Sequence, residues 1–171
     1  MISSIIIILA VIVLDQASKL LLQPFLMAQP GQTLPLIRDV FHFTYVENEG
    51  AAFGMLADKR WIFMVLSVIG IGALLAWLLI TKPQSKWMRY ALAFVIGGGI
   101  GNMIDRVRLG YVIDFIDCRF IRFYEFNVAD SFVCIGCGMF LLAVVIDEVR
   151  AFRQKKKDAA APAPSDGTKH E

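Results

Sequence analysis

Four long apolar runs constrain the fold of this chain more than any other feature of its sequence. They cover residues of about 2–22, 61–80, 88–105 and 128–149. Each run is close to the ~20 residues that a helix needs to cross the hydrocarbon core of a bilayer. Hydrophobic residues make up 57% of the chain, whereas soluble domains contain about 45–50%. The sequence therefore predicts an all-α integral membrane protein with four transmembrane helices.

These spans and their connections are expected to form one domain, residues 1–157. The Ala/Pro-rich segment 158–171 is expected to be a disordered cytoplasmic tail. The first run could instead be a cleaved signal peptide, which would need basic residues before it and a small-x-small site after it. No Lys or Arg precedes the run, and no such site follows it. We therefore interpret it as a retained span.

Basic residues predict how the spans are oriented. The short connection after the second span and the segment after the fourth span carry dense positive charge: Lys82, Lys86, Arg89, Arg150, Arg153, Lys155, Lys156 and Lys157. Cytoplasmic flanks are enriched in Lys and Arg, so both termini are expected in the cytoplasm. Segments 23–60 and 106–127 then face outward. The net charge of +2 is too small to suggest nucleic-acid binding.

The first outward segment contains the pattern of a short strand. Its prolines, Pro24 among them, are expected to interrupt any helix. Residues 41–46 then alternate, with Phe41, Phe43 and Tyr45 on one face and His42 on the other. The sequence predicts a small β element at the membrane surface, with its aromatic face toward lipid or substrate and with His42 solvated.

Two short motifs within the apolar runs have plain structural interpretations. Gly97 and Gly101 form a GxxxG motif, which lets another helix approach closely. Cys134 and Cys137 form a CxxC motif without a second pair or a nearby histidine, so we interpret them as small residues on a helix face rather than as a zinc or redox site.

Polar residues at the outward ends of the spans are the candidates for chemistry, because ionisable groups beside membrane spans are costly to keep. Asp114 and Asp130 flank a connection that can fold back. Two close carboxylates share a proton, as in aspartic proteases. No Ser or Cys has a plausible His base, and no cluster has metal-ligand spacing, so no cofactor is expected. A plainer alternative stays open, in which Asn127 and Asp130 cap a helix and Asp114 is an interfacial carboxylate.

The pair formed by Asp15 and Lys19 also has two interpretations. The two residues are four positions apart and share one face of the first helix. They can form a simple ion pair near the membrane surface, with Lys19 extended toward water. Alternatively, they can orient a substrate headgroup or a catalytic neighbour.

Five segments resemble the successive signature blocks of the lipoprotein signal peptidase family. They are LDQASK at 14–19, VENEGAAFG at 46–54, GGGIGNMIDR at 97–106, GYVIDF at 110–115 and FNVADS at 126–131. The blocks occur in the family order and extend over most of the chain. The resemblance implies an aspartic peptidase of the bacterial inner membrane, with four transmembrane helices, a small periplasmic β cradle and a periplasmic helical segment.

The resemblance also implies roles for individual residues. The catalytic pair falls on Asp114 and Asp130. Supporting positions fall on Asp15, Lys19, Asn48, Asn102, Asp105, Arg106, Asn127 and Ala129. The implied substrate is a prolipoprotein whose cysteine already carries diacylglycerol, which is cut just before that cysteine. Membrane lipids and globomycin-type inhibitors are the other implied ligands, and nothing requires more than a monomer.

An alternative from another class is a small transporter or proton-conducting protein that uses the same carboxylates. Such a protein is expected to contain an internal repeat with paired broken helices, and the sequence contains none that we recognise.

Overall fold

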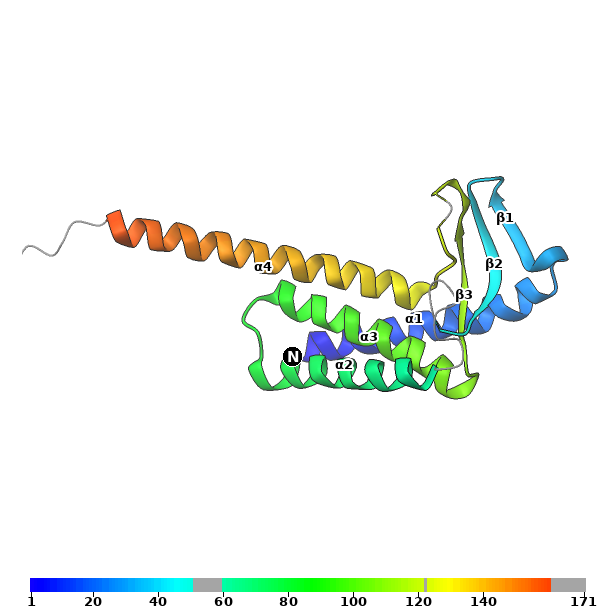
Figure 1. Ribbon diagram of the computed structural model, residues 1–171, viewed down its shortest axis with the longest axis horizontal. Coiled ribbons are helices and arrows are strands. Elements are labelled where there is room, and N and C mark those ends of the chain that lie inside the picture. Colours follow the sequence, from blue (N-terminus) through cyan, green and yellow to red (C-terminus); the bar gives the residue numbers. More distant parts are fainter. Residues whose placement is uncertain (51–59, 122, 161–171) are drawn as a thin grey trace, which may run out of the picture.

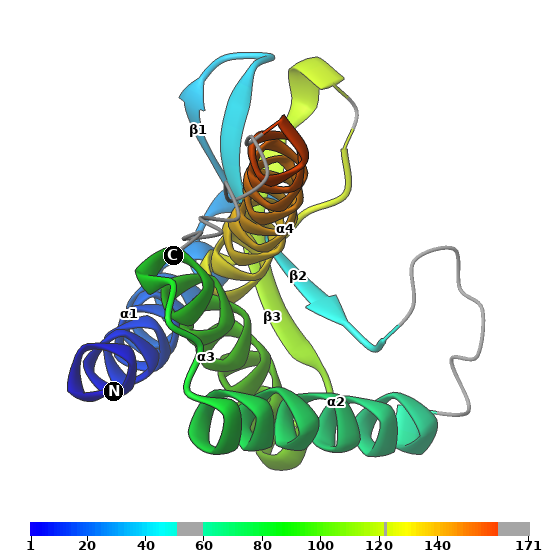
Figure 2. The same ribbon diagram turned by 90° about the vertical axis from the view of Figure 1, so that its left-hand side faces the viewer.

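The computed structural model describes residues 1–50, 60–121 and 123–160. Within these residues the fold has four long helices: α1 Ile2–Met27, α2 Arg60–Thr81, α3 Lys86–Arg108 and α4 Val128–Ala160. They run side by side, and a small sheet crosses one end of the bundle (Figure 1). α3 is the helix that contacts all three of the others, and it lies between α2 and the α1–α4 pair (Figure 2).

Three of these helices have the length and apolar composition of membrane spans. They comprise α1, residues Met64–Thr81 of α2, and residues Val128–Lys156 of α4. α3, at 23 residues, has the length, but its glycines and the polar residues Asn102, Asp105 and Arg106 make it less hydrophobic. The chain is therefore a mostly helical, multi-pass membrane protein. The predicted third span, residues 88–105, coincides with a helix that hydropathy alone does not identify as membrane-spanning.

Two predicted helix ends are wrong. α1 continues beyond residue 22, through Pro24 to Met27. A proline removes one helical hydrogen bond, but the last turn of α1 is held in place by Leu26, which packs in a buried cluster with Tyr45 and Phe115. At the other end, α4 extends to Ala160, so residues 158–160 of the predicted disordered tail are helical. The rest of that tail, 161–171, lies outside the described residues.

The sheet is antiparallel, with strand order β1-β2-β3. Its strands are β1 Thr33–Ile37, β2 Phe41–Asn48 and β3 Val112–Cys118. β2 confirms the predicted strand, whereas β3 arises from the second outward connection and is followed by one 3-10 turn, Arg119–Ile121. Val46 pairs with Asp114 across β2 and β3, so the sheet links the first outward segment to a candidate carboxylate.

The predicted orientation of the aromatic face is wrong for Tyr45. Tyr45 is only 7% exposed and packs with Leu26 of α1 and Phe115 of β3, and the Phe43 and Phe115 rings meet edge to face, 5.8 Å between centroids. Tyr45 is buried because the apolar side of a sheet needs a partner, and Leu26 at the end of α1 provides it, whereas Phe41 and Phe43 stay half-buried. His42, expected to be solvated, is only 5% exposed.

The glycines of α3 allow the close helix packing that the GxxxG motif predicts. A Cβ atom at Gly97 would lie 2.9 Å from Cβ of Val11 on α1, and one at Gly98 would collide with the carbonyl oxygen of Ala129 on α4. This approach of three helices brings their polar residues together. Cys134 and Cys137 lie exposed on α4 as free thiols, as expected of small residues on a helix face.

Candidate active site

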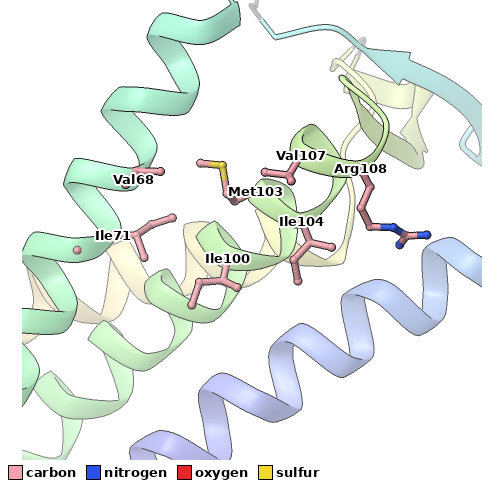
Figure 3. Close-up of a pocket in the computed structure, with 8 residues that line it drawn as sticks. Val68, Ile71, Ile100, Met103, Ile104, Val107 and Arg108 are labelled. Carbon is pink, nitrogen blue, oxygen red and sulfur yellow. The ribbon is translucent and has the colours of Figure 1, made fainter.

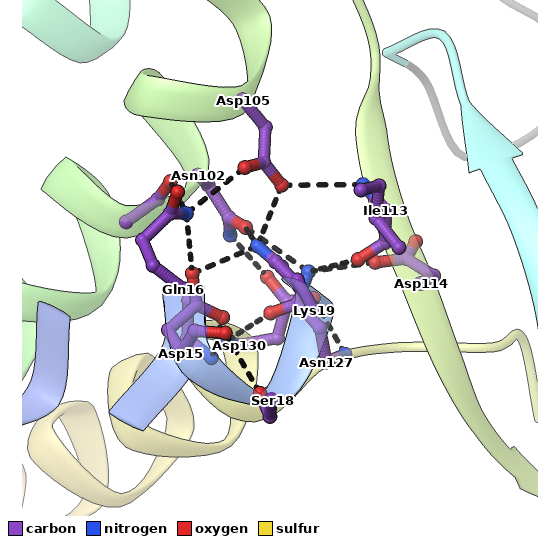
Figure 4. Close-up of polar contacts among 12 residues, drawn as sticks. Asp15, Gln16, Ser18, Lys19, Asn102, Asp105, Ile113, Asp114, Asn127 and Asp130 are labelled. Carbon is purple, nitrogen blue, oxygen red and sulfur yellow. Dashed lines mark hydrogen bonds and ion pairs between the residues drawn. The ribbon is translucent and has the colours of Figure 1, made fainter. Parts of the chain in front are cut away.

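A cluster of buried polar side chains lies where the ends of α1, α3 and α4 meet strand β3 (Figure 4). α1 contributes Asp15 and Lys19, α3 contributes Asn102 and Asp105, and β3 contributes Asp114. Asn127 and Asp130 stand at the start of α4. Residues from four separate segments of the chain thus converge on one site, at the end of the bundle that carries the sheet.

Lys19 stands at the centre of this cluster. Its ammonium group is buried and lies 2.9 Å from Oδ2 of Asp15 and 2.8 Å from Oδ2 of Asp105. Its third contact is a hydrogen bond of 3.1 Å to Oδ1 of Asn102. An ammonium has three N–H donors, and all three are used. The predicted Asp15–Lys19 ion pair therefore forms, but it is buried rather than at the surface. Lys19 also pairs with Asp105, and this second contact joins α1 to α3.

Asp15 extends the same network to α4. Its Oδ1 accepts the backbone N–H of Ala129 at 3.0 Å, and Ala129 itself is fully buried. A side chain larger than that of Gly101 would not fit here, because its Cβ would lie 2.7 Å from Oδ2 of Asp15. The small residues at 101 and 129 therefore let the carboxylate of Asp15 reach two helices.

Gln16 also belongs to the cluster, although it is not among the predicted site residues. Its Nε2 lies 2.9 Å from Oδ1 of Asp105 and 3.2 Å from both the carbonyl oxygen of Gly101 and Oδ2 of Asp15. Its Oε1 accepts a long bond of 3.5 Å from Arg108. The sequence feature that could have identified Gln16 as a site residue is its position directly after Asp15, as a polar residue within an apolar run.

Asn127 connects the two candidate carboxylates. Its Nδ2 lies 2.7 Å from Oδ1 of Asp114. Its Oδ1 accepts the backbone N–H of Asp130 at 2.9 Å, and its own backbone N–H donates to Oδ2 of Asp130 at 3.2 Å. The second pair of bonds is a reciprocal helix cap. The expected capping role is therefore confirmed, and the same side chain also holds Asp114.

Each oxygen of the Asp114 and Asp130 carboxyl groups accepts a hydrogen bond from a side-chain or backbone amide N–H. Oδ2 of Asp114 accepts from Asn48 at 2.8 Å, and Oδ1 of Asp130 accepts from Asn102 at 2.7 Å. Asp114 is 1% exposed, whereas Asp130 is half-buried. Burial raises the pKa of Asp114 to about 7, against the opposing bond from Asn48 and with a further increase from the charge of Asp130. Asp114 therefore carries a proton in much of the protein at neutral pH.

Arg106 lies at the edge of the cluster. Its guanidinium is half-buried and interacts electrostatically with Asp130, Asp114 and Asp105. Among the described residues no carboxylate lies within 4.0 Å of it. The structure thus brings together all ten predicted site residues, of which Arg106 alone lacks a direct hydrogen bond or ion pair within the cluster.

The arrangement favours acid–base chemistry between two carboxylates. His42 lies at another part of the sheet, paired with Asp117 rather than with Asp114. In the part of the chain that the structure describes, no group of three His, Cys, Asp or Glu side chains is placed to hold a metal ion. Of the four carboxylates in the cluster, Asp15 and Asp105 are paired with Lys19, whereas Asp114 and Asp130 form no ion pair among the described residues.

A comparison with known sequences identifies the family. The sequence model described as signal peptidase (SPase) II matches residues 7–146, a range that includes every residue of the polar cluster. The chain belongs to the signal peptidase II family. Membership makes it a peptidase, and therefore a hydrolase, and it confirms the resemblance that the five sequence blocks indicated.

Individual relatives agree with this assignment. A lipoprotein signal peptidase of Caldanaerobacter subterraneus subsp. tengcongensis is 49% identical over 133 residues, which make up 78% of this chain and 89% of that protein. One of Clostridioides difficile is 41% identical over 147 residues, 86% of this chain and 97% of that protein. A solved bacterial membrane enzyme aligns with a TM-score of 0.77 at 31% identity, covering 85% of this chain and 89% of that one.

Proposed function

We propose that this protein is an intramembrane aspartic endopeptidase that removes signal peptides from diacylglyceryl-modified prolipoproteins, cutting just before the lipidated cysteine. Its relatives carry the name lipoprotein signal peptidase. The observation that carries the catalytic part of the proposal is the position of Asn127: its side-chain Nδ2 donates to Oδ1 of Asp114, and its backbone N–H donates to Oδ2 of Asp130. One residue therefore holds both carboxyl groups.

The two carboxyl groups are proposed to divide the work. Asp114, buried and with a pKa near neutrality, holds the proton and donates a hydrogen bond to the carbonyl oxygen of the scissile peptide. Asp130, half-buried, takes a proton from the attacking water. Environments that differ in this way separate the acid from the base. The proton taken by Asp130 is then available for the leaving amine.

The surrounding residues are proposed to fix the geometry of this pair. Asn48 and Asn127 each hold one oxygen of Asp114, which sets the plane of its carboxyl group. Asn102 does the same for Asp130 and is itself bonded by Lys19. Arg106 adds a positive charge close to both carboxylates. These contacts support the proposal that Asn48, Asn102 and Lys19 are positioning residues rather than catalytic ones.

The membrane arrangement follows from charge and from the position of the cluster. We propose that α3 spans the membrane with the other three helices, because it packs between them and its 23 residues extend about 35 Å at 1.5 Å per residue. The N-terminus and the α2–α3 connection lie at the end of the bundle away from the sheet (Figure 1). That basic end is placed in the cytoplasm, and the active site at the periplasmic face of the inner membrane.

An apolar groove of about 420 Å³ opens between α2 and α3 (Figure 3). Its walls are Val68, Ile71, Gly72, Ile100, Met103, Ile104 and Val107, and Arg108 stands at its edge. Arg108 also reaches Gln16 of the polar cluster, so the groove begins next to the site. We propose that it receives an acyl chain of the lipidated substrate, while the peptide lies across the carboxylates.

The decisive experiment replaces each catalytic carboxylate by its amide. An amide keeps the shape of a carboxyl group, but at position 130 it cannot accept the proton of water, and at position 114 it cannot give up a proton to the peptide carbonyl oxygen. Asp114→Asn and Asp130→Asn are each expected to abolish cleavage of a purified lipidated precursor, and the double variant should be no worse than either, because residues that act as a unit are not additive. Asp117→Asn, on the same strand, is the matched control and should retain turnover. Wild-type turnover in both amide variants would refute the mechanism.

A further inference from the structure

A second groove lies at the other end of the molecule, where the first turn of α3 meets α4. It has a volume of about 260 Å³ and is lined by Ser85, Trp87, Met139, Leu142, Ala143 and Ile146, with Asp147 and Arg150 at its mouth. This end holds the N-terminus and the α2–α3 connection, and α4 extends past the other helices here (Figure 1). The groove is therefore remote from the carboxylates and plays no part in the proposed cleavage.

One face of α4 changes from apolar to basic along this groove. Ala143, Ile146, Arg150 and Arg153 are spaced by three and four residues, so their side chains lie on the same face of the helix. The first two line the apolar part of the groove and Arg150 lies at its mouth. Arg153 follows one turn farther out and is exposed. A hydrocarbon slot thus ends beneath two guanidinium groups.

The charges around the mouth are mainly positive. On the α3 side, exposed Lys86 lies between the two lining residues Ser85 and Trp87. The acid at the mouth, Asp147, is 3.8 Å from Arg150, and both side chains are well exposed. Exposed ion pairs of this kind contribute little free energy, so the pair with Asp147 does not prevent Arg150 from binding an anion. Glu148 is the other nearby acid, and Lys155 and Lys156 follow on the basic side.

We propose that this groove binds one anionic phospholipid of the leaflet opposite the active site. An acyl chain fills the slot beside Trp87, a residue type that favours the interface between hydrocarbon and headgroups. The phosphate is held by Arg150 and Arg153, whose planar guanidinium groups suit phosphate oxygens, with Lys86 on the facing helix. Basic pockets between membrane helices are known to bind acidic headgroups. The lipid contacts both α3 and α4 and so joins their ends.

The test uses the fluorescence of Trp87. A Trp61→Phe/Trp77→Phe protein retains Trp87 as its one tryptophan and is placed in phosphatidylcholine vesicles. Brominated phosphatidylglycerol, which quenches tryptophan on contact, should quench Trp87 more strongly than brominated phosphatidylcholine at the same mole fraction. Arg150→Gln/Arg153→Gln should weaken the preference for phosphatidylglycerol about fivefold per arginine, in line with about 1 kcal/mol for each basic residue near an anionic surface.

Two controls separate this site from general attraction to the membrane. Arg38, which lies in the β1–β2 turn and is 92% exposed in its side chain, is at the sheet end, and Arg38→Gln should leave the preference unchanged. Ile146→Phe should narrow the slot and reduce quenching by both brominated lipids. Equal quenching by the two lipids, or an equal effect of Arg38→Gln, would overturn the proposal. Native mass spectrometry of the protein with all tryptophans retained should show phosphatidylglycerol bound to the wild type and lost from Arg150→Gln/Arg153→Gln.

Discussion

Replacing Asp114 by Asn should make the folded protein gain stability relative to the wild type as the pH rises, while it removes activity. Burial, together with the charge of Asp130, outweighs the bonds from Asn48 and Asn127 and raises the pKa of Asp114 from 3.8 to about 7. Ionising this carboxyl group therefore costs more in the folded chain than in the unfolded chain. Its contribution to stability is fully present below pH 3.8 and is lost as the pH rises through about 7.

The size of the effect follows from this difference in pKa. At about 1.4 kcal/mol per pH unit, the change from 3.8 to about 7 corresponds to about 4 kcal/mol of stability lost by pH 8. An asparagine never ionises, but its NH2 group cannot accept the hydrogen bond that either Asn48 or Asn127 donates to Asp114. Because that lost bond is the same at every pH, the stability of Asp114→Asn relative to the wild type should rise by up to about 4 kcal/mol between pH 4 and pH 8.

The assay is thermal unfolding in detergent micelles at pH values from 4 to 8. For a chain of this length, 1 kcal/mol shifts Tm by about 2–4 °C, so Tm of the variant relative to that of the wild type should increase by roughly 8–16 °C from pH 4 to pH 8. Taking the difference between variant and wild type at each pH cancels the titration of every other group.

Asp117 on the same strand provides a control with the opposite sign. Burial raises its pKa, but hydrogen bonds from Arg119 and Thr44 outweigh this and lower the pKa overall. Its stabilisation is present at neutral pH and is lost as the pH falls through the lowered pKa. Asp117→Asn should therefore be less stable than the wild type at pH 8 and approach it in acid. A pH-independent difference for Asp114→Asn, or a relative stability that falls from pH 4 to pH 8, would refute the reasoning.

Three further outcomes are expected. Lys19→Met leaves two buried carboxylates unpaired and should cost about 3–5 kcal/mol in thermal unfolding; an unchanged Tm would show that Lys19 is not needed for the cluster. Ile104→Trp, which fills the groove between α2 and α3, should raise KM for a lipidated precursor and leave kcat nearly unchanged, and an unaltered KM would exclude that groove as the acyl site. Reporter fusions at Thr33 and Lys82 should report opposite sides of the membrane, and a common side would overturn the proposed orientation.

The sequence was sufficient where the signal is local. Long apolar runs predicted membrane helices, alternation at 41–46 predicted a strand, and the spacing of Asn127 and Asp130 predicted a helix cap, all of which occur in the structure. Hydropathy is less decisive for α3, because the glycines that let it pack between its neighbours also lower its apolar content. The same residues that weaken the membrane signal are those that position the site.

Predictions failed where the outcome depends on distant neighbours. Nothing local indicates that Tyr45 faces α1 or that His42 lies in a central strand, because β3, which comes from beyond residue 110, covers one edge of β2. Pro24 is tolerated within α1 because Leu26, two residues later, packs in a buried hydrophobic cluster whose other members come mainly from the sheet. These features depend on contacts between segments far apart in the chain.

By itself, the sequence determined that the chain is a membrane protein, that it belongs to a peptidase family, and which residue types are available at the site. Only the tertiary structure decided how those residues are connected. Gly98 and Gly101 let α3 approach α4 and α1, Lys19 then pairs with two carboxylates, and Asn127 joins Asp114 to Asp130. The reason is physical: spacing along a chain defines which side chains share a helix face, but burial and hydrogen-bond partners are set by whatever packs against that face.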